Sequence, residues 1–301
     1  MKRKSKKKPR KVTKAVIAAA GYGTRFLPAT KNQPKEMLPI IDKPIIHHLV
    51  DELVLSGITD IIIVTRAGQG IMEDYFDNHV ELEHMLEANN KREMLKRIKR
   101  IPKLANFVYV RQKKSLPYGN ATPLLSAAPL IDDDEAFAYL FGDDLTISKT
   151  PVVKQLIDVY LDQNPSAVLA VQEVPDDEVE RYGTVKYKKK AKYKYDISEV
   201  LEKMPLGKNP SNMAQFGRFV FTNDVLKQVK GTKLGIGSEL WVADVLNNVM
   251  KRGKRVIAQP IKGEWLTTGD PLRYMKTQVK YALRRKDIGK DFASFLKELK
   301  L

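Results

Sequence analysis

The stretch "AAGYGTRFLPATKNQPKEMLP", residues 19–39, decides the fold of this chain. It follows the apolar run "KAVIAAA" (residues 14–20), which predicts a short buried strand that ends at a glycine loop. The two glycines of the loop let the backbone approach a ligand closely, with N–H groups free to donate. Arg25 and Lys35 supply cations for phosphate oxygens, and three prolines stiffen the segment that carries them. This combination predicts a cradle for a triphosphate.

Two familiar phosphate-binding motifs do not fit this stretch. The loop of nucleotide hydrolases requires G-x-x-x-x-G-K-[ST], which is absent. The dinucleotide fingerprint G-x-G-x-x-G opens a helix, but here Phe26 replaces the third glycine and Pro28 stands where the helix should continue. The glycines alone would predict only a structural turn. The cations and prolines that follow them favour a triphosphate site without a helix dipole.

The rest of the chain alternates between two periodicities. Runs typical of buried strands are "TDIIIVT" (59–65), "NFVYVRQ" (106–112) and "EAFAYLFGDD" (135–144), and runs with helical spacing are "IIHHLVDELVLSG" (45–57) and "PVVKQLIDVYLDQ" (151–163). The alternation predicts an α/β fold: a doubly wound, mostly parallel, Rossmann-like sheet with helices on both faces. Residues 79–100 predict one long charged helix. Residues 182–205 alternate tyrosine or valine with lysine, which predicts an exposed hairpin in a small appended β-rich portion.

The composition limits the cellular compartments and the binding partners that we expect for this protein. The chain of 301 residues has no cysteine, so we expect neither disulfides nor a thiolate metal site, and a cytoplasmic location. No apolar run approaches the roughly 18 residues that a membrane span requires. The net charge of +17 is concentrated at the start of the chain. We predict a disordered basic tail over residues 1–13 and one domain over residues 14–301; the tail is either a solubilising extension or a weak contact for nucleic acid or an anionic surface.

The opening stretch resembles the signature of the sugar-1-phosphate nucleotidylyltransferases, G-x-G-T-R-x-x-P-x-T-x-x-x-P-K. The segment "KEMLPIIDKP" (35–44) resembles the branch of this family that uses UTP and glucose 1-phosphate, and "YGTV" (182–185), "SNMAQFGRFVF" (211–221) and "TTGDPLRYMKT" (267–277) look like its later motifs in order. The resemblance covers residues 14–301 and implies that a sugar 1-phosphate oxygen attacks the α-phosphorus of a nucleoside triphosphate, releasing pyrophosphate. The nucleophile is already anionic, so catalysis requires positioning and charge neutralisation rather than a general base.

The resemblance also implies the site residues. The expected catalytic residues are Arg25, Lys35 and Lys203. The expected substrate-binding residues are Ala20, Gly21, Gly23, Glu36, Gln112, Gly119, Gly183 and Glu202. The expected magnesium ligand is Asp143, the first of two acids at the end of a predicted strand, although a single aspartate there could also be a turn residue. The amide of Gln112 can donate to and accept from a uracil imide at once.

Several positions depart from the family pattern. Asn120 stands where the family usually has histidine, and Thr267 stands where relatives carry an aspartate as the second metal ligand. Asp270 is either a replacement ligand or the cap of the next helix. These departures leave open the same chemistry on dTTP or mannose 1-phosphate, or a catalytically weakened nucleotide-sugar binding protein. Further site candidates are Asn212 and Arg218. The family also implies a homo-oligomer, either dimer or tetramer.

The remaining aromatic and histidine residues are interpreted as packing residues. Trp241 and Trp265 are expected to fill space rather than to stack on a ligand. The four histidines lack a spacing that would bring them together with further metal ligands.

Overall fold

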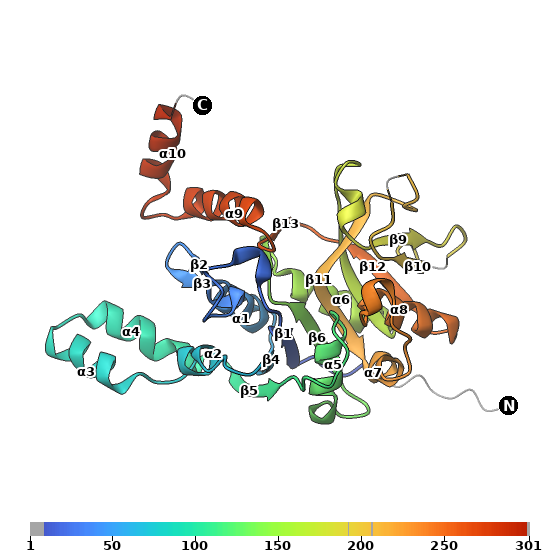
Figure 1. Cartoon of the computed structure of the whole chain (residues 1–301), viewed down its shortest axis with the longest axis horizontal. Helices are drawn as coiled ribbons and strands as arrows, with labels where there is room; N and C mark the ends of the chain where they lie inside the picture. Colours follow the sequence, from blue (N-terminus) through green and yellow to red (C-terminus); the bar gives the residue numbers. More distant parts are fainter. Residues whose placement is uncertain (1–8, 192, 206, 300–301) are drawn as a thin grey trace.

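The computed structural model of the chain describes residues 9–191, 193–205 and 207–299. A nine-stranded sheet runs through its centre, with β10, β9, β11, β6, β1, β4 and β5 in that order and β8 and β12 attached through β11 (Figure 1). These strands are β1 (Lys14–Ala18), β4 (Asp60–Thr65), β5 (Asn106–Arg111), β6 (Ala136–Phe141), β8 (Ala167–Glu173), β9 (Thr184–Tyr187), β10 (Ile197–Leu201), β11 (Met213–Thr222) and β12 (Val256–Pro260). Neighbours are parallel from β6 through β1 and β4 to β5, whereas β11 runs antiparallel to β6 and β8.

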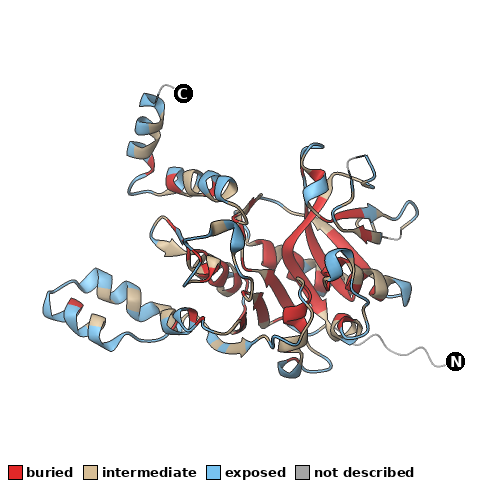
Figure 2. Ribbon diagram, viewed as in Figure 1, coloured by how far each residue is buried: buried red, intermediate tan, exposed pale blue. Residues whose placement is uncertain are grey.

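Helices cover both faces of this sheet, as the sequence predicts. The two faces are distinguished by alternate residues of β1: Ala15 and Ile17 face one apolar cluster, and Val16 faces the other. The first cluster includes α1 (Ile45–Leu55) and α6 (Val152–Gln163), and the second includes α5 (Thr122–Ala127), α7 (Asn223–Val229) and α8 (Val242–Lys251). Figure 2 shows the buried residues concentrated in the sheet and on the helix faces against it. The doubly wound architecture is therefore confirmed.

Two further two-stranded sheets, several 3-10 turns and two C-terminal helices complete the described part of the fold. The small sheets are β2 (Pro39–Ile40) with β3 (Lys43–Pro44), and β7 (Asp144–Ile147) with β13 (Glu264–Thr267). The 3-10 turns are η1 (Thr24–Phe26), η2 (Lys35–Met37), η3 (Ile101–Lys103), η4 (Ala128–Leu130), η5 (Val179–Arg181) and η6 (Ile236–Ser238). At the C-terminal end, α9 (Pro271–Arg284) and α10 (Gly289–Glu298) extend away from the sheet (Figure 1).

The prediction of one long helix over residues 79–100 is wrong. The segment follows α2 (Ile71–Tyr75) and forms two helices, α3 (Val80–Ala88) and α4 (Arg92–Arg100), which make an extension on the side of the molecule (Figure 1). The break lies at Asn90, whose φ of 53° is in the left-handed region. Asparagine tolerates this conformation better than most residues, and it commonly ends helices for that reason.

The predicted hairpin forms, but it is partly buried rather than exposed, because it belongs to the central sheet. Strands β9 and β10 pair antiparallel, and Thr184 of β9 pairs with Ala214 of β11. Val185 and Val200 face the second apolar cluster, while Lys186 points to solvent. The appended β-rich portion thus continues the edge of the main sheet.

The folded part begins earlier than the predicted boundary at Lys14. Val12 is buried, and the carbonyl of Thr13 accepts a hydrogen bond from the backbone N–H of Thr59 at 2.8 Å. Arg10 forms an ion pair with Asp134. The apolar side chain of Val12 joins the core. This was not predicted from the sequence, because Val12 lies among basic residues. The remaining predicted tail, residues 1–8, lies outside the described residues. Among the described helices, none is long and apolar enough to cross a membrane.

Candidate active site

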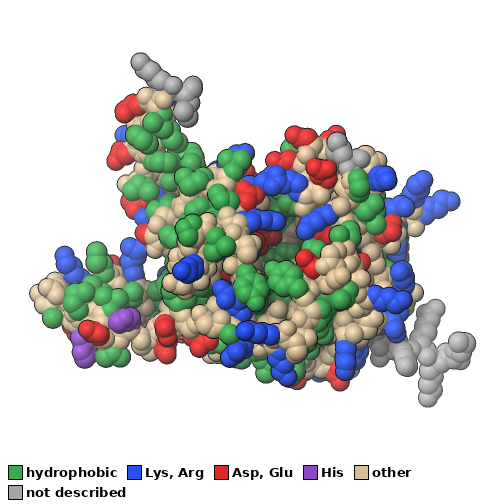
Figure 3. Space-filling model, viewed as in Figure 1, with side chains coloured by type: hydrophobic (Ala, Val, Ile, Leu, Met, Phe, Trp, Pro, Cys, Tyr) green, Lys and Arg blue, Asp and Glu red, His purple; other side chains and the backbone are tan. Residues whose placement is uncertain are grey.

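A cavity of about 370 Å³ opens at the carboxyl ends of β1, β5 and β6. In open α/β sheets ligands bind at this edge, because the loops that leave parallel strands converge there. Figure 3 shows a hollow near the middle of the visible face, with Lys and Arg side chains around it. Ten of the twelve predicted site residues line the cavity: Ala20, Gly21, Gly23, Arg25, Lys35, Glu36, Gln112, Gly119, Asp143 and Lys203. The other two, Gly183 and Glu202, contact one another beside Lys203.

At two positions around the cavity, the backbone conformation and the space available fit only glycine. Gly23 has a φ of 63°, and a Cβ there would lie 3.2 Å from the side chain of Thr30. The Thr30 hydroxyl donates to the Gly23 carbonyl at 2.7 Å, which holds the loop closed. Gly119 has a φ of 139°, and a Cβ there would lie 2.2 Å from the carbonyl oxygen of Leu240. Neither position accepts a side chain, so the backbone itself forms the wall of the cavity.

Lys35 and Asp143 form an ion pair on the floor of the cavity. The Lys35 Nζ lies 2.5 Å from the Asp143 Oδ2. Burial would raise the pKa of Asp143, but the charge and hydrogen bond of Lys35 hold it below the usual range. Burial would lower the pKa of Lys35, but Asp143 and Glu36 raise it. Both groups are therefore charged, and the carboxylate remains available for a cation.

Arg25 approaches the same point from the glycine loop. Its Nη1 donates to the carbonyl of Gly269 at 3.2 Å. A Cβ added at Gly269 would lie 3.3 Å from both the Asp143 Oδ2 and the Thr267 Oγ1, and 3.7 Å from the Arg25 Nη1. Arginine, carboxylate and threonine hydroxyl thus converge around one glycine, where a side chain would occupy their common space.

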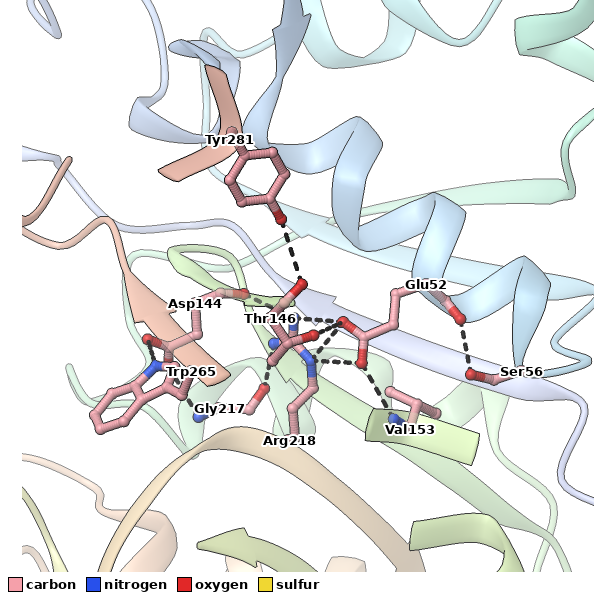
Figure 4. Close-up of polar contacts among 9 residues, drawn as sticks. All are labelled: Glu52, Ser56, Asp144, Thr146, Val153, Gly217, Arg218, Trp265 and Tyr281. Carbon is pink, nitrogen blue, oxygen red and sulfur yellow. Dashed lines mark hydrogen bonds and ion pairs between the residues drawn. The ribbon is translucent and has the colours of Figure 1, made fainter. Parts of the chain in front are cut away.

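Asp144 has a different environment from its neighbour. Its Oδ2 accepts a hydrogen bond from the backbone N–H of Gly217 at 2.9 Å, and its Oδ1 accepts one from the indole Nε1 of Trp265 at 2.7 Å (Figure 4). Burial, followed by the charge of Asp143, raises the pKa of Asp144 to about 6. Of the two adjacent acids, only Asp143 lines the cavity.

The donor set fits a cation that needs few protein ligands. Among the described residues there is no group of three or more His, Cys, Asp or Glu side chains that could hold a metal ion. Magnesium is usually held by one or two carboxylates together with substrate phosphates and water. Asp143 beside a phosphate cradle meets this requirement. Asp270 does not, because it caps α9 by accepting from the Arg273 N–H at 3.0 Å and also pairs with the Arg273 guanidinium.

Three predicted or neighbouring polar side chains carry buried oxygen atoms without a hydrogen-bond partner among the described residues. These atoms are the Oε2 of Glu36, the Oε1 of Gln112 and the Oε1 of Gln215. Burial raises the pKa of Glu36 to about 7. Glu36 and Gln112 line the cavity. Buried acceptors are normally satisfied, so acceptors left free there point to a ligand that supplies donors.

Next to Lys203, which lines the cavity, lies a group of residues near the edge of the sheet. Gln215 Nε2 donates to the Glu202 Oε2 at 3.1 Å, and a Cβ at Gly183 would lie 2.4 Å from the same Gln215 nitrogen. Burial raises the pKa of Glu202. The Lys203 Nζ lies 4.5 Å from the centre of the Trp241 ring, and Lys203 has a φ of 45°. A non-glycine residue in the left-handed region is a strained feature that often marks a functional site.

Two residues were not predicted as site residues from the sequence: Trp241, which lines the cavity, and Gln215, which contacts Glu202 beside it. Trp241 was expected only to pack, yet it lines the cavity beneath Lys203. Gln215 was not considered, although it lies within the quoted motif "SNMAQFGRFVF". Both occur in segments with recognisable motifs, but their orientation depends on the pairing of β9 with β11 and on the position of α8.

Asn120 lines the cavity, whereas the further candidates Asn212 and Arg218 do not. The Asn120 Oδ1 accepts from the N–H of Val242 at 2.8 Å and thereby caps α8. Arg218 is completely buried and pairs with Glu52, which also accepts from the Thr146 hydroxyl (Figure 4). Asn212 donates to Glu173 away from the cavity. The four histidines form no metal cluster among the described residues.

A glycine-rich phosphate cradle, two cations and a cavity-facing carboxylate at the end of a parallel sheet are the parts of a nucleotidyl-transfer site. A family model described as nucleotidyl transferase matches residues 14–283, and the chain belongs to this family. The UTP–glucose-1-phosphate uridylyltransferase 2 of Staphylococcus saprophyticus is 42% identical over 292 residues, which are 97% of this chain and 99% of that protein. The corresponding enzyme of Staphylococcus epidermidis is 40% identical over 290 residues, which are 96% of this chain and 99% of that protein.

Solved structures agree with these relatives. The UTP-bound UGPase of Acinetobacter baumannii superposes with a TM-score of 0.86 at 31% identity, over 96% of this chain and all of that chain. A UDP-glucose pyrophosphorylase complexed with UDP-glucose gives a TM-score of 0.80 at 36% identity, over 91% of this chain and all of that chain. The resemblance and the fold class expected from the sequence are therefore confirmed.

Proposed function

We propose that this protein transfers UMP from UTP to glucose 1-phosphate, which yields UDP-glucose and pyrophosphate. The observation that carries the proposal is the cavity in which Arg25, Lys35 and Asp143 converge beside buried acceptors that lack partners among the described residues. Relatives named for this reaction align over almost the whole chain, which supports the same pair of substrates.

The residues on the phosphate side neutralise charge. Arg25 and Lys35 bind the triphosphate and stabilise the charge that develops on pyrophosphate as it leaves. The attacking oxygen belongs to a phosphate and is already anionic, so no side chain has to remove a proton. The backbone of the loop at Ala20, Gly21 and Gly23 approaches the nucleotide closely, because no larger side chain intervenes.

Nucleotide and sugar are recognised at different walls. Gln112 pairs with the uracil imide, for which its free Oε1 is an acceptor, while Glu36 and Gly119 line the nucleotide end. At the other wall, Gly183 leaves room for the sugar and Glu202 accepts from its hydroxyls. Lys203 binds the sugar phosphate.

Nucleotidyl transferases of this family generally use a divalent metal. We assign the cation as Mg²⁺ and its protein ligand as Asp143, because a single carboxylate next to phosphate oxygens suits magnesium. When bound, the ion would supply positive charge that offsets the negative charge of the nucleotide phosphates. Lys35 keeps the Asp143 carboxylate ionised and oriented for this purpose.

The test is the release of pyrophosphate across a matrix of nucleotides and sugar 1-phosphates. We expect UTP with glucose 1-phosphate to give the highest kcat/KM. Preference for dTTP or mannose 1-phosphate would replace the substrates but retain the chemistry. Binding of UDP-glucose without turnover for any pair would mean that the protein is a nucleotide-sugar binding protein.

Three expectations from the sequence stay predictions. A homo-oligomer is expected from the family, and a cytoplasmic location from the absence of cysteine. The third is weak binding of nucleic acid or an anionic surface by the basic tail, of which residues 1–8 lie outside the described residues. Deleting residues 1–8 should weaken such binding and leave turnover unchanged, because Val12 and the strand that follows remain.

A further inference from the structure

We call the side of the cavity with Arg25, Lys35 and Asp143 the phosphate wall, and the side of Lys203, with Gly183 and Glu202 beside it, the sugar wall. Trp265 is not among the residues that line the cavity. Its indole N–H donates to Asp144 at 2.7 Å (Figure 4). One face of its ring stacks on Phe216, with ring centres 4.9 Å apart and planes inclined by 11°. The ring of Tyr182 meets it edge-on at 4.8 Å. One side chain therefore contacts three segments that are distant in the sequence.

The Asp144 end of this contact is fixed to the phosphate wall. Asp144 follows Asp143 directly, and its Oδ2 accepts from the N–H of Gly217 at 2.9 Å. The carbonyl of Asp143 accepts from the N–H of Thr268 at 2.7 Å and from its hydroxyl at 2.8 Å. Asp143 is thus held through its own carbonyl and through the neighbouring carboxylate.

The aromatic end is fixed to the sugar wall. The carbonyl of Tyr182 accepts from the N–H of Lys203 at 3.3 Å. Phe216 follows Gln215, whose N–H donates to the carbonyl of Gly183 at 2.8 Å. A shift of the indole ring would therefore move the backbone that carries the sugar-side residues.

A role in packing alone does not explain why an aspartate stands at position 144. Asp144 is 5% exposed and adjacent to a second carboxylate. Burying an acid in this position is unfavourable unless its hydrogen bonds compensate, and a well-packed apolar residue often serves stability as well or better. An acid at this position provides a directional contact to Trp265 that an apolar side chain cannot make.

We propose that the Asp144–Trp265 hydrogen bond sets the separation between Asp143 and the sugar-side residues Gly183, Glu202 and Lys203. Asp144 and Trp265 are positioning residues, since neither lines the cavity. The inference rests on the proposed function and deepens it: the contact controls how the sugar phosphate is aligned with the bound nucleotide, and it leaves nucleotide binding itself unaffected.

Trp265→Phe tests this inference because it keeps an aromatic ring and deletes the N–H. We expect the KM for glucose 1-phosphate to rise about tenfold and kcat to fall about tenfold, since misplacement of reacting groups is costly for rate. The dissociation constant of UTP, measured without sugar phosphate, should stay within about twofold. The matched control is Tyr187→Phe, which deletes a donor to the Ala258 carbonyl at 3.3 Å away from the cavity. It should change none of the three values.

The partner of the contact supplies a second test. Asp144→Asn cannot accept from both Trp265 and Gly217, because its amide nitrogen is a donor. It should show the same split between sugar and nucleotide, and the double variant should be no worse than the poorer single variant. If Trp265→Phe does not fold, Asp144→Asn alone decides the question.

Two outcomes overturn the inference. Kinetic constants that stay unchanged while Tm falls would make the contact structural only, and a UTP dissociation constant that rises as much as the KM would mean general loosening. Failure of the proposed function is distinguishable from both. In that case the parent shows no turnover. Binding can still be compared between Trp265→Phe and the parent: a loss of affinity for UDP-glucose that exceeds the loss for UTP would support the inference.

Discussion

The two walls of the cavity are built in different ways. On the phosphate wall, the described charged groups are already paired in the free protein: Lys35 with Asp143 at 2.5 Å, and Arg25 with the Gly269 carbonyl. On the sugar wall, Lys203 rests on the Trp241 ring and the Gln215 Oε1 has no partner among the described residues. The first wall forms at the ends of central parallel strands, and the second at the edge of the sheet.

This difference indicates that the phosphate wall stabilises the transition state and that the sugar wall binds the sugar phosphate. Groups that stabilise a developing charge are most effective when they are oriented before the reaction, because no reorganisation is then needed. A wall that selects a sugar works through hydrogen bonds made when the sugar arrives, and its free acceptors are satisfied at that moment. Substitutions on the phosphate wall should therefore reduce rate, whereas substitutions on the sugar wall should reduce affinity for the sugar phosphate.

The largest effect is expected for Asp143→Asn. The change removes the proposed metal ligand and the ion-pair partner of Lys35, so we expect kcat/KM to fall by at least about 10³-fold. Asp144→Asn should have a smaller effect. Steady-state kinetics of both folded variants at saturating magnesium provide the measurement. Equal collapse would mean that both acids hold the metal, and equal tolerance would remove the metal from this end of β6.

Removal of the cations on the same wall should come next. Lys35→Ala and Arg25→Ala should each reduce transition-state stabilisation by about 2–4 kcal/mol, the range for loss of one preorganised charge contact. The loss should appear mainly in kcat. Single-turnover rates separate chemistry from binding, and circular dichroism checks the fold. A variant that keeps near-native kcat/KM would exclude that cation from the cradle.

Glu36 gives a prediction on stability rather than rate. Its pKa is raised by burial from 4.5 to about 7 in the folded protein. The stability that it contributes is therefore fully present below about pH 4.5 and is lost as the pH rises through about 7. The shift corresponds to about 3 kcal/mol. The free energy of unfolding is measured against pH, between pH 4.5 and 8, for the parent and for Glu36→Gln. The variant should lack the loss of stability that Glu36 causes in the parent. Parallel curves for the two proteins would mean that Glu36 is not buried as an acid.

Lys203→Ala tests the sugar wall. Loss of one charged hydrogen bond to phosphate should raise the KM for glucose 1-phosphate by about 10- to 100-fold. The dissociation constant of UTP should remain close to that of the parent, because Lys203 follows β10 at the edge of the sheet, whereas the glycine loop follows β1 in its interior. Equilibrium binding of UTP next to initial-rate kinetics measures both. If UTP affinity falls as strongly as sugar affinity, the division between the walls is wrong.

The smallest effect is expected at Thr267. Its hydroxyl lies near Asp143 around Gly269, so Thr267→Asp places a second carboxylate close to the proposed metal ligand. The magnesium concentration for half-maximal turnover should fall by a few fold. Asp270→Asn should leave this concentration almost unchanged, since asparagine caps a helix about as well as aspartate. A sharp rise in the magnesium requirement of Asp270→Asn would contradict the assignment of Asp270 as the α9 cap.

Local motifs made much of the fold and the phosphate wall predictable. The strand before the glycine loop, the conformation of Gly23 and the acids at the end of β6 depend on neighbours in the sequence, so residues 19–39 and 135–144 carried that information. The break at Asn90 was missed because helical spacing continues on both sides of it. An asparagine that can adopt a left-handed conformation does not reveal from the sequence whether it does so.

By itself, the sequence determined the family, the alternating architecture and the kinds of group present in the cavity, because these depend on local periodicity and on motifs of fixed spacing. Only the tertiary structure decided which partner each polar group contacts, including the different partners of two adjacent acids. It turns Asp143 toward Lys35, which is 108 residues away, and Asp144 toward Trp265, which is 121 residues away. Such choices follow from strand pairing and from the burial of each side chain, and both depend on the packing of the whole sheet.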